Sequence, residues 1–414
     1  AHQFKKSGKK FHAAGISFKD IGNLEKAKNC FINAAHAFIE IQKYETVLDL
    51  LRLASETLLL VEDYLGAHQL YKDSIEFISN LKKADNRDDK YILFSVLSYL
   101  CLFVKGRQDE GLDYLKRTQK KVDSSHFKEN ALIRLVTDIT IALRDKNQDQ
   151  LEKVKDLASS LKFRKYEISL LKKVILLVQS QLLLDAHMIL NKLEYTTNEI
   201  INLTINFDTS SLSREFKNAF YEYEIKSFEI TKISLEMSDN LSLNKKPSYP
   251  IGINVGKINP IELVLKPHFQ LDKPFIGPAH ITCSLNNNLI FVYEVEAIEV
   301  KLTSPPPTLE ISLKNLRPPL IGQSFPLQIQ LQNNSEGEAL DVKISVEFPE
   351  LLKVMRGTIE KQIYALRKNE ELNWDLNIKP MEAGDYNIKV KVNFKDPDQN
   401  EIEELKEFPF SIRL

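Results

Sequence analysis

The chain has 414 residues, of which 43% are hydrophobic and 27% are charged, and its formal net charge at pH 7 is −1. This length and composition are typical of a globular protein with about two to four domains and sizeable apolar cores. A charge near zero gives no whole-molecule signal for nucleic acid. No run of about 18 apolar residues predicts a membrane span, and the charged first residues lack the pattern of a secretory signal.

Proline and charge divide the chain into two halves. All 16 prolines lie at or after Pro247, and a long stretch without proline favours helices because an interior proline costs roughly 3 kcal/mol in a helix. Residues 1–193 carry 32 Lys and Arg against 25 Asp and Glu, a net charge of +7. Residues 194–414 carry 24 against 32, a net charge of −8. We therefore predict a mildly basic helical half followed by a mildly acidic half of another class.

Residues 11–80 repeat with a period of 20. Small residues recur at positions 15, 35 and 55, and large ones recur at positions 18, 38 and 58. The same spacing relates the small residues Ala27, Val47 and Ala67 and the large residues Phe31, Leu51 and Tyr71. A period of one helix plus its turn predicts antiparallel helices in which small residues admit the large side chains of the next helix.

Taken in pairs, these helices resemble the tetratricopeptide repeat. The pattern of that repeat falls on Phe11, Gly15, Phe18, Ala27, Phe31 and Ala34. The unit is nearer 40 residues, and over residues 8–80 it is similar to the solenoid of the soluble NSF attachment proteins. This resemblance implies a right-handed α-solenoid whose partners are helical bundles of vesicle trafficking. It also implies that the first helix of each pair faces a protein-binding groove, which would expose Lys9, His12, Lys19, Asp49, Arg52 and Glu56.

Further helices are expected at about 87–105, 108–122, 126–144, 148–161 and 164–192, separated by polar breaks. The last of these is long and strongly apolar, as is typical of a helix that is covered on several sides. We therefore assign residues 1–193 to the solenoid. A single compact helical bundle is the alternative that the same pattern leaves open.

From about Thr196 the apolar period changes from 3.6 to 2. Alternating stretches such as "INLTINFD" and "AHITCSLN", separated by proline and glycine, predict an antiparallel β-sandwich over 194–302. The segment "TSPPPT" at 303–308 predicts a stiff linker, because consecutive prolines favour an extended form. About seven or eight short strands in 309–414 then predict an immunoglobulin-like sandwich with Trp374 in its core.

The second predicted sandwich is similar to the immunoglobulin-like modules of the CARDB class. The residues that carry this similarity are Gly322, Phe325, Asn333, Ala339, Asp341 and Pro349. The fold class expected from the sequence is therefore multidomain, with an α-solenoid followed by two antiparallel immunoglobulin-like β-sandwiches.

Motifs for catalysis or metal binding are missing from the sequence. It contains no phosphate-binding glycine loop after a strand, no H-E-x-x-H and no paired cysteines. We predict that the chain is not an enzyme and needs no cofactor or metal. The three cysteines lie far apart, which favours a reducing compartment and predicts a cytoplasmic protein, with peripheral contact at membranes as an additional location.

Runs of basic residues give a second candidate surface in the helical half. Its members are Lys116, Arg117, Lys120, Lys121, Lys162, Arg164 and Lys165. Such runs are often only solvated helix surface, and the other interpretation is a face that contacts acidic helices or anionic lipid. Aromatic residues do not interleave with them in a nucleic-acid pattern, so nucleic acid is not predicted as a partner.

Two functions of different classes remain at this point. The first is a non-enzymatic adaptor or scaffold of a trafficking-like, coat-like or tether-like system, which binds protein partners through the solenoid. The alternative is a structural or cell-surface module that uses immunoglobulin-like domains as stalk or adhesion units. The sequence does not determine whether the two halves dock on each other.

Overall fold

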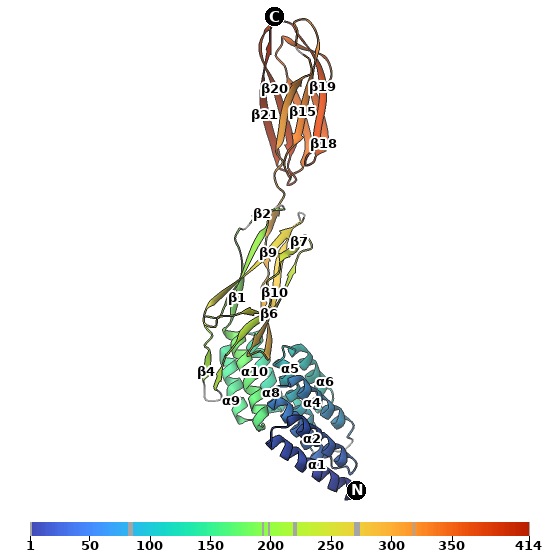
Figure 1. The fold of residues 1–414 in the computed structure, drawn as a ribbon, viewed down its shortest axis with the longest axis vertical. Coiled ribbons are helices and arrows are strands. Elements are labelled where there is room, and N and C mark those ends of the chain that lie inside the picture. The colour runs from blue at the N-terminus through green and yellow to red at the C-terminus, as the bar shows by residue number, and fades with distance from the viewer. Residues whose placement is uncertain are drawn as a thin grey trace.

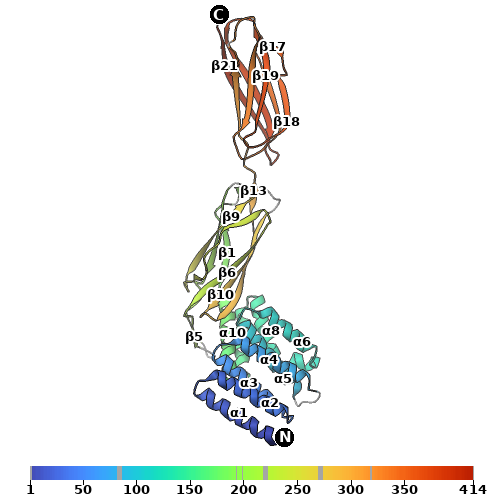
Figure 2. The ribbon, with the colours of Figure 1, turned by 45° about the vertical axis from the view of Figure 1, so that its right-hand side comes forward.

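The computed structural model describes residues 2–81, 86–192, 194–197, 199–217, 222–268, 274–317 and 319–413. A stack of helices forms one end of an elongated molecule, and two β-sandwiches follow it end to end, with the C-terminus farthest from the helices (Figures 1 and 2). The chain is therefore multidomain, α then β, and its β domains are immunoglobulin-like sandwiches, as the sequence predicts.

The described part of the chain contains ten helices. They are α1 (His2–Asp20), α2 (Leu24–Ile39), α3 (Tyr44–Leu60), α4 (Tyr64–Ser79), α5 (Arg87–Phe103), α6 (Gln108–Gln119), α7 (Ser124–Glu129), α8 (Ala131–Arg144), α9 (Gln148–Ser160) and α10 (Lys165–Leu183). No helix among the described residues is both long and apolar enough to cross a bilayer.

The stacking of the first helices follows from the 20-residue period. A Cβ atom on Gly15 of α1 would lie 2.6 Å from the Phe31 ring of α2, and one on Gly8 would lie 2.7 Å from the Phe38 ring. Glycine at both positions therefore lets these rings approach the first helix closely. The turn between the helices has Gly22 at φ +79° and Asn23 as the N-cap, whose side chain accepts a hydrogen bond from the Lys26 amide.

Two helix boundaries differ from the sequence prediction. The expected helix 126–144 is broken at Asn130, which has extended backbone and caps α8 through its side chain. The expected helix 164–192 ends at Leu183, and Asp185–Leu190 is instead a β-strand that pairs antiparallel with residues 203–208. Apolar periodicity does not place this change, because the strand has six residues of which only Met188 is buried, so no clear alternation marks its start. The first sandwich therefore begins near 185, and not at 194.

The first sandwich contains two main sheets, with strand orders β1-β3-β9-β7 and β11-β10-β6-β8. The bounds of its strands are β1 (Asp185–Leu190), β2 (Glu194–Thr196), β3 (Ile201–Asp208), β4 (Glu215–Lys217), β5 (Glu222–Glu224), β6 (Phe228–Met237), β7 (Leu241–Lys245), β8 (Ile251–Gly252), β9 (Ile258–Pro267), β10 (Phe275–Leu285), β11 (Leu289–Val295), β12 (Ile298–Glu299) and β13 (Lys301–Thr303).

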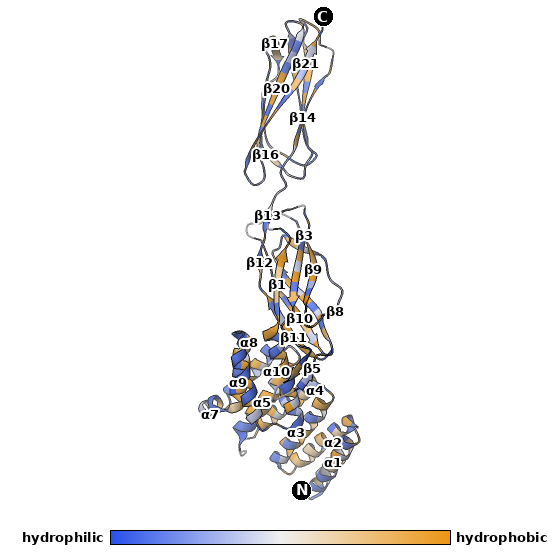
Figure 3. Ribbon diagram, turned by 90° about the vertical axis from the view of Figure 1, so that its left-hand side faces the viewer, coloured by the Kyte–Doolittle hydropathy of each residue, from blue (hydrophilic) through white to orange (hydrophobic). Residues whose placement is uncertain are grey.

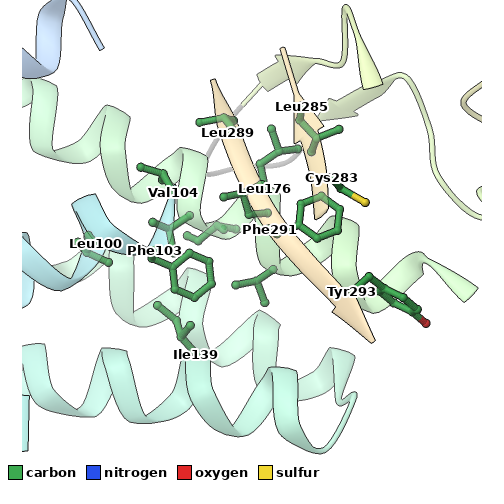
Figure 4. Packing of buried hydrophobic residues seen from close by; sticks show 14 of the residues in the cluster. Leu100, Phe103, Val104, Ile139, Leu176, Cys283, Leu285, Leu289, Phe291 and Tyr293 are labelled. Carbon is green, nitrogen blue, oxygen red and sulfur yellow. The ribbon is translucent and has the colours of Figure 1, made fainter. Parts of the chain in front are cut away.

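The helical stack and the first sandwich share one apolar core. Phe103 of α5, Leu176 of α10 and Phe291 of β11 belong to the same buried cluster, and all three are fully buried (Figure 4). The backbone continues this contact, because the Ile290 amide donates a hydrogen bond of 2.8 Å to the Val104 carbonyl at the end of α5. The halves dock through apolar packing rather than through their opposite net charges.

Polar groups at the rim of this joint pair across it. Lys105 donates to the side chain of Asn288 at the β10–β11 turn, and the Asn288 amide donates to Glu62 at 2.9 Å. Lys173 of α10 also contacts Glu62 and donates to the Tyr64 hydroxyl at 2.7 Å. Burial opposes ionisation of Glu62, but the hydrogen bonds from Lys173 and Asn288 outweigh it and hold its pKa below the ordinary value.

The second sandwich has two four-stranded sheets, β14-β15-β19-β17 and β18-β16-β20-β21, and a core of its own. Trp374 belongs to this core, as predicted. The strand bounds are β14 (Leu309–Asn315), β15 (Phe325–Asn333), β16 (Ala339–Glu347), β17 (Leu352–Arg356), β18 (Glu360–Leu366), β19 (Glu371–Pro380), β20 (Gly384–Lys395) and β21 (Glu401–Ile412).

The proline segment joins the two sandwiches. Thr303 still belongs to β13, so irregular backbone occupies 304–308 and not the whole of the predicted linker 303–308. The segment packs on the second sandwich, since a Cβ atom on Gly337 would lie 2.0 Å from the Pro305 carbonyl oxygen. The Thr308 amide also donates to the Ser335 hydroxyl at 2.8 Å. A ribbon coloured by hydropathy shows this connection as a thin neck between two separate bodies (Figure 3).

Candidate functional site

The residues expected to line a groove contact helix α10 instead. Arg52 of α3 donates two hydrogen bonds, of 2.6 and 2.5 Å, to the carboxylate of Glu167. The Glu167 side chain is fully buried, and that of Arg52 is 15% exposed. Burial disfavours the charged guanidinium, but the hydrogen bonds and charge of Glu167 outweigh it and raise the Arg52 pKa. This ion pair therefore holds α10 against α3.

Three more groove candidates join the same network. Arg164, just before α10, donates to Glu56 at 3.0 Å and to Asp49 at 3.1 Å. Lys19 of α1 donates to Glu56 at 3.4 Å. Lys19, Arg52 and Glu56 therefore do not line an open groove, because α10 and the segment before it contact them, whereas the Asp49 side chain stays exposed. Of the remaining two candidates, Lys9 is exposed and His12 lies half-buried with its ring 6.1 Å from Phe31.

The predicted basic surface separates into two places. Lys162, Arg164 and Lys165 lie in the segment that enters α10, where Arg164 is held by ion pairs and the two lysines are exposed. Lys116, Arg117, Lys120 and Lys121 lie on α6 and directly after it, and all four are exposed. The two groups do not form one continuous face, and the second group lines two hollows.

The first hollow, which we call the basic pocket, lies between α4, α5 and α6 and has a volume of about 470 Å³. Its walls combine cations with tyrosine rings and hydroxyl groups. The residues are Lys72, Ile75, Glu76, Ser79, Tyr91, Tyr114, Arg117, Thr118, Lys120 and Lys121.

Positive charge dominates the basic pocket. Four cations face one carboxylate, that of Glu76, among the described residues that line it. Lys121 lies 5.8 Å from the centre of the Tyr91 ring and donates to the Ser79 hydroxyl at 3.4 Å, while Arg117 lies 5.6 Å from the Tyr114 ring. Within the described ranges, none of Lys72, Arg117, Lys120 and Lys121 forms an ion pair. Cations placed on aromatic faces without a carboxylate partner are available to an anion.

A buried histidine supports the tyrosine wall. The His68 ring lies 5.4 Å from the Tyr114 ring, and its Nδ1 is 2.8 Å from the Ser98 hydroxyl. Burial lowers the pKa of His68, because the imidazolium would lose hydration, and this effect exceeds the opposing charge of Glu110. The ring that packs against Tyr114 is therefore a neutral imidazole near pH 7.

The second hollow, which we call the apolar groove, lies between α6, α7 and α8 and has a volume of about 380 Å³. Its floor contains mainly aliphatic and aromatic side chains, with cations at its edge. The residues are Leu112, Leu115, Lys116, Gln119, Phe127, Ile133, Val136, Thr137, Thr140, Ile141 and Arg144. Both edge cations have a local partner: Lys116 pairs with Asp113 at 3.0 Å, and Arg144 pairs with Asp145 at 2.7 Å.

The two hollows flank the same helix. Positions 112, 115, 116 and 119 line the apolar groove, and positions 114, 117 and 118 line the basic pocket. The two sets are offset by two residues, which is about 200° around a helix of 3.6 residues per turn. The exposed ridge between them carries Asp113, Lys116, Arg117 and Lys120.

The sequence identified part of this site. The basic run at 116–121 was a candidate, and the spacing of Tyr114, Arg117 and Lys121 is itself a signal for one helix face. Sequence reasoning missed Lys72, Tyr91 and the apolar floor of the groove, because these sites form only where other helices pack against α6. Among the described residues, no group of three or more His, Cys, Asp or Glu is arranged to hold a metal ion.

No protein-family model matches the chain, and no curated protein does. Among solved structures, the chain is similar to an ASH/PapD-like domain of human CEP192 at 13% identity, over 27% of this chain and 89% of that domain, with a TM-score of 0.19. It is also similar to alpha-2-macroglobulin of Escherichia coli at 9% identity, over 56% of this chain and 22% of that one, with a TM-score of 0.21.

A third similar structure is the transglutaminase of red sea bream, at 8% identity over 61% of this chain and 34% of that one, with a TM-score of 0.23. The chain thus spans less than two thirds of the two longer proteins. Likenesses at such identities and TM-scores carry no conclusion about activity or partners, so the functional argument rests on the residues of this chain.

Proposed function

We propose that this chain is a non-enzymatic adaptor or scaffold that holds acidic segments of other proteins on the surface formed by α4–α8. The observation that carries the proposal is the basic pocket, where four cations without a carboxylate partner in the described residues lie beside the apolar groove. Charge at such a site raises the rate of encounter with an acidic partner, and the groove adds apolar burial that retains it.

The resemblance of α1–α4 to tetratricopeptide pairs and to the soluble NSF attachment proteins supports this class of function. It favours a right-handed solenoid in a trafficking-like, coat-like or tether-like system, with helical-bundle partners. Helical arrays of this kind work by presenting an extended surface to another protein. Because α10 occupies the face of α3 where such a groove would lie, we place the partner on the α4–α8 surface instead.

The expected location is the cytoplasm, including membrane surfaces reached through a partner. The three cysteines are free thiols, and Cys101 and Cys283 are buried in the core shared by the helices and the first sandwich. Burial raises the pKa of both thiols, so neither is poised for exchange. This arrangement is consistent with a reducing compartment.

The test is affinity capture with the full chain as bait, compared with a charge-neutralised variant. The variant replaces Lys72, Arg117, Lys120 and Lys121 by glutamine. Its matched control replaces the same number of exposed cations elsewhere, namely Lys128, Lys153, Lys162 and Lys165. We expect a set of acidic proteins that binds the wild type and the control, is lost from the pocket variant, and weakens with salt. Equal capture by all three baits would contradict the proposal.

One observation favours the alternative of a structural module. The two sandwiches and the helical stack follow each other end to end, which is a spacer geometry (Figure 1). In that case capture of partner proteins would require the second sandwich, and the charge-neutralised pocket variant would capture the same proteins as the wild type. The full chain should be used for both tests, because a bait cut at residue 193 would expose the core that the helices share with the first sandwich.

A further inference from the structure

We infer that the basic pocket binds a phosphorylated serine or threonine in an extended segment of a partner protein, and that an apolar side chain three to four residues away enters the apolar groove. This inference rests on the proposed function and names the ligand of the same surface. The predicted ligand motif is a phosphorylated residue and an apolar residue three to four positions apart, and binding involves no covalent change.

The pocket offers donors from several directions. Lys72 comes from α4, Arg117 from α6, and Lys121 from the turn after α6. Hydroxyl groups of Ser79 and Tyr91 lie on the same wall, 3.2 Å apart. A phosphomonoester has three acceptor oxygens in a tetrahedral array, so it can accept hydrogen bonds from separate elements at once.

The charge balance favours a dianion over a single carboxylate. The described lining residues carry four positive charges and one negative charge. A phosphate on serine or threonine carries about −1.5 to −2 charges at pH 7, against −1 for an aspartate or glutamate. A carboxylate is also planar and matches one guanidinium, so it would leave the lysines on the other walls without a partner.

The second contact follows from the position of the apolar groove. The hollows lie on opposite faces of α6, so a ligand that fills both must cross the helix, whose diameter with side chains is about 10 Å. An extended chain advances about 3.3 Å per residue, so a crossing takes three to four residues. The ridge that the ligand must cross carries three cations, Lys116, Arg117 and Lys120, and one carboxylate, Asp113. Acidic residues in the connecting segment of the ligand would therefore be favoured.

The surroundings favour a protein segment over an anionic bilayer. Asp123 lies two residues after Lys121, and its amide donates to the carboxylate of Asp88 at 3.3 Å. Asp89 is next to Asp88 and is exposed. A carboxylate held by the backbone two residues after Lys121 weakens the attraction to a flat anionic surface, whereas a single chain can enter the pocket without meeting it.

The test measures binding of fluorescein-labelled peptides of 13 residues to the full chain by anisotropy. Each peptide carries a central phosphoserine in a Ser/Gly background, and one leucine placed in turn two to six residues away on either side. Matched peptides carry serine or glutamate at the centre. We expect the phosphoserine peptides to bind about tenfold or more tighter than the glutamate peptides, because charge-assisted contacts to phosphate are stronger and more numerous. Affinity should peak with leucine three or four residues away.

Two variants assign these effects to the two hollows. Lys121→Gln should reduce the preference for phosphate over glutamate, because it removes a cation that a glutamate would leave without a partner. Ile141→Ser should remove the leucine preference while it leaves the phosphate preference intact. Lys162→Gln is the control for the loss of one exposed charge, and circular dichroism checks that each variant folds.

The outcomes separate the inference from the proposed function. Equal affinity for phosphoserine and glutamate peptides overturns the inference and leaves an acidic-protein adaptor standing. If no peptide binds, while vesicles of phosphatidylcholine with a phosphorylated inositol lipid bind in a manner that requires Lys121, both the inference and the protein-binding proposal are overturned. If neither peptides nor vesicles bind, the inference is overturned, and the capture experiment alone decides the proposed function.

Discussion

The two joints of this molecule are built in opposite ways. Between the helical stack and the first sandwich, the β10–β11 hairpin enters the helical core, and Phe291 packs in one cluster with Phe103 and Leu176 (Figure 4). Between the two sandwiches, residues 304–308 form a proline-rich segment, and the cores on either side are separate. The first joint makes one folding unit from two classes of secondary structure, and the second joins two units.

This difference teaches which parts of the chain act together. A shared core transmits a local disturbance to both sides, because removal of a buried side chain leaves a cavity that both layers line. A polyproline segment keeps the two domains that it joins at a set distance and direction, but it contributes little to the free energy of unfolding of either domain. We therefore expect a helical stack and first sandwich that unfold together, and a second sandwich that unfolds alone.

The sequence supplies separate reporters for the two units. Trp374 is the single tryptophan and lies in the second sandwich, so its fluorescence reports that unit alone. The described helices all lie in the first unit, so circular dichroism at 222 nm reports chiefly on it. Urea unfolding followed by both signals can therefore test each prediction below in the intact chain.

The largest effect is expected from a cavity in the shared core. Phe291→Ala should destabilise the first unit by about 3–5 kcal/mol, because the ring is fully buried in the core that the helices share with the first sandwich. The circular dichroism midpoint should fall, while the Trp374 midpoint should stay in place. Phe394→Ala in the core of the second sandwich is the matched control and should give the reverse pattern. Movement of both midpoints in either variant would contradict two independent units.

The next effect tests the ion pair that fixes α10 on α3. Arg52→Met should destabilise the first unit by about 3 kcal/mol, because it leaves the carboxylate of Glu167 buried without its partner. Arg144→Met is the control, since its pair with Asp145 is on the surface, where solvent screening leaves the pair little effect on stability. If the two variants have equal midpoints, the Arg52–Glu167 pair is not structural.

A smaller effect is expected at the neck between the sandwiches. Gly337→Ala adds a Cβ atom that would lie 2.0 Å from the Pro305 carbonyl oxygen, so the proline segment must move away from the second sandwich. We expect a loss of about 1–2 kcal/mol in the Trp374 transition, as for other overpacked sites, and a change in the maximum dimension by small-angle X-ray scattering. Gly322→Ala, in open space at positive φ, separates backbone strain from this contact.

The smallest effect is expected from pH. The pKa of His68 is lowered below its ordinary value near 6.5 in the folded chain, chiefly by burial, so the unfolded chain binds the proton more readily. This contribution to the stability of the first unit is therefore fully present above pH 6.5 and is lost as pH falls below that value. His68→Gln should reduce this loss. All eight histidines precede residue 281, so the Trp374 midpoint should have no histidine-linked change over the same range.

Most of the fold could be predicted from the sequence, because helix periodicity, strand alternation and turn residues all indicated the same elements. The 20-residue period fixed the helix pairing at Gly15 and Phe31, and alternation fixed most strands of both sandwiches. The boundary near residue 184 was missed, because the apolar residues of "LLLDAHMIL" continue on both sides of Asp185 and His187, and the identity of the strand depends on its pairing with β3. The shared core was also out of reach, since nothing local relates Phe103 to Phe291.

Only part of the candidate site could be predicted from the sequence. The sequence shows the basic run on α6, but it does not distinguish Arg117 from Arg164. Arg117 has no ion pair among the described residues, whereas Arg164 pairs with Glu56 and Asp49. Both are arginines in basic stretches of helical sequence. What separates them is whether a carboxylate from a distant helix reaches them.

The sequence by itself determined the classes of structure and their order, because periodicity, proline placement and turn residues act over a few neighbouring positions. It determined two sandwiches, a proline-rich connection and a basic α6. Only the tertiary structure decided that α10 covers the expected groove, that one core spans helices and strands, and that two hollows flank α6. Each of those facts depends on side chains from separate helices or strands, and such contacts follow from packing, which local patterns do not encode.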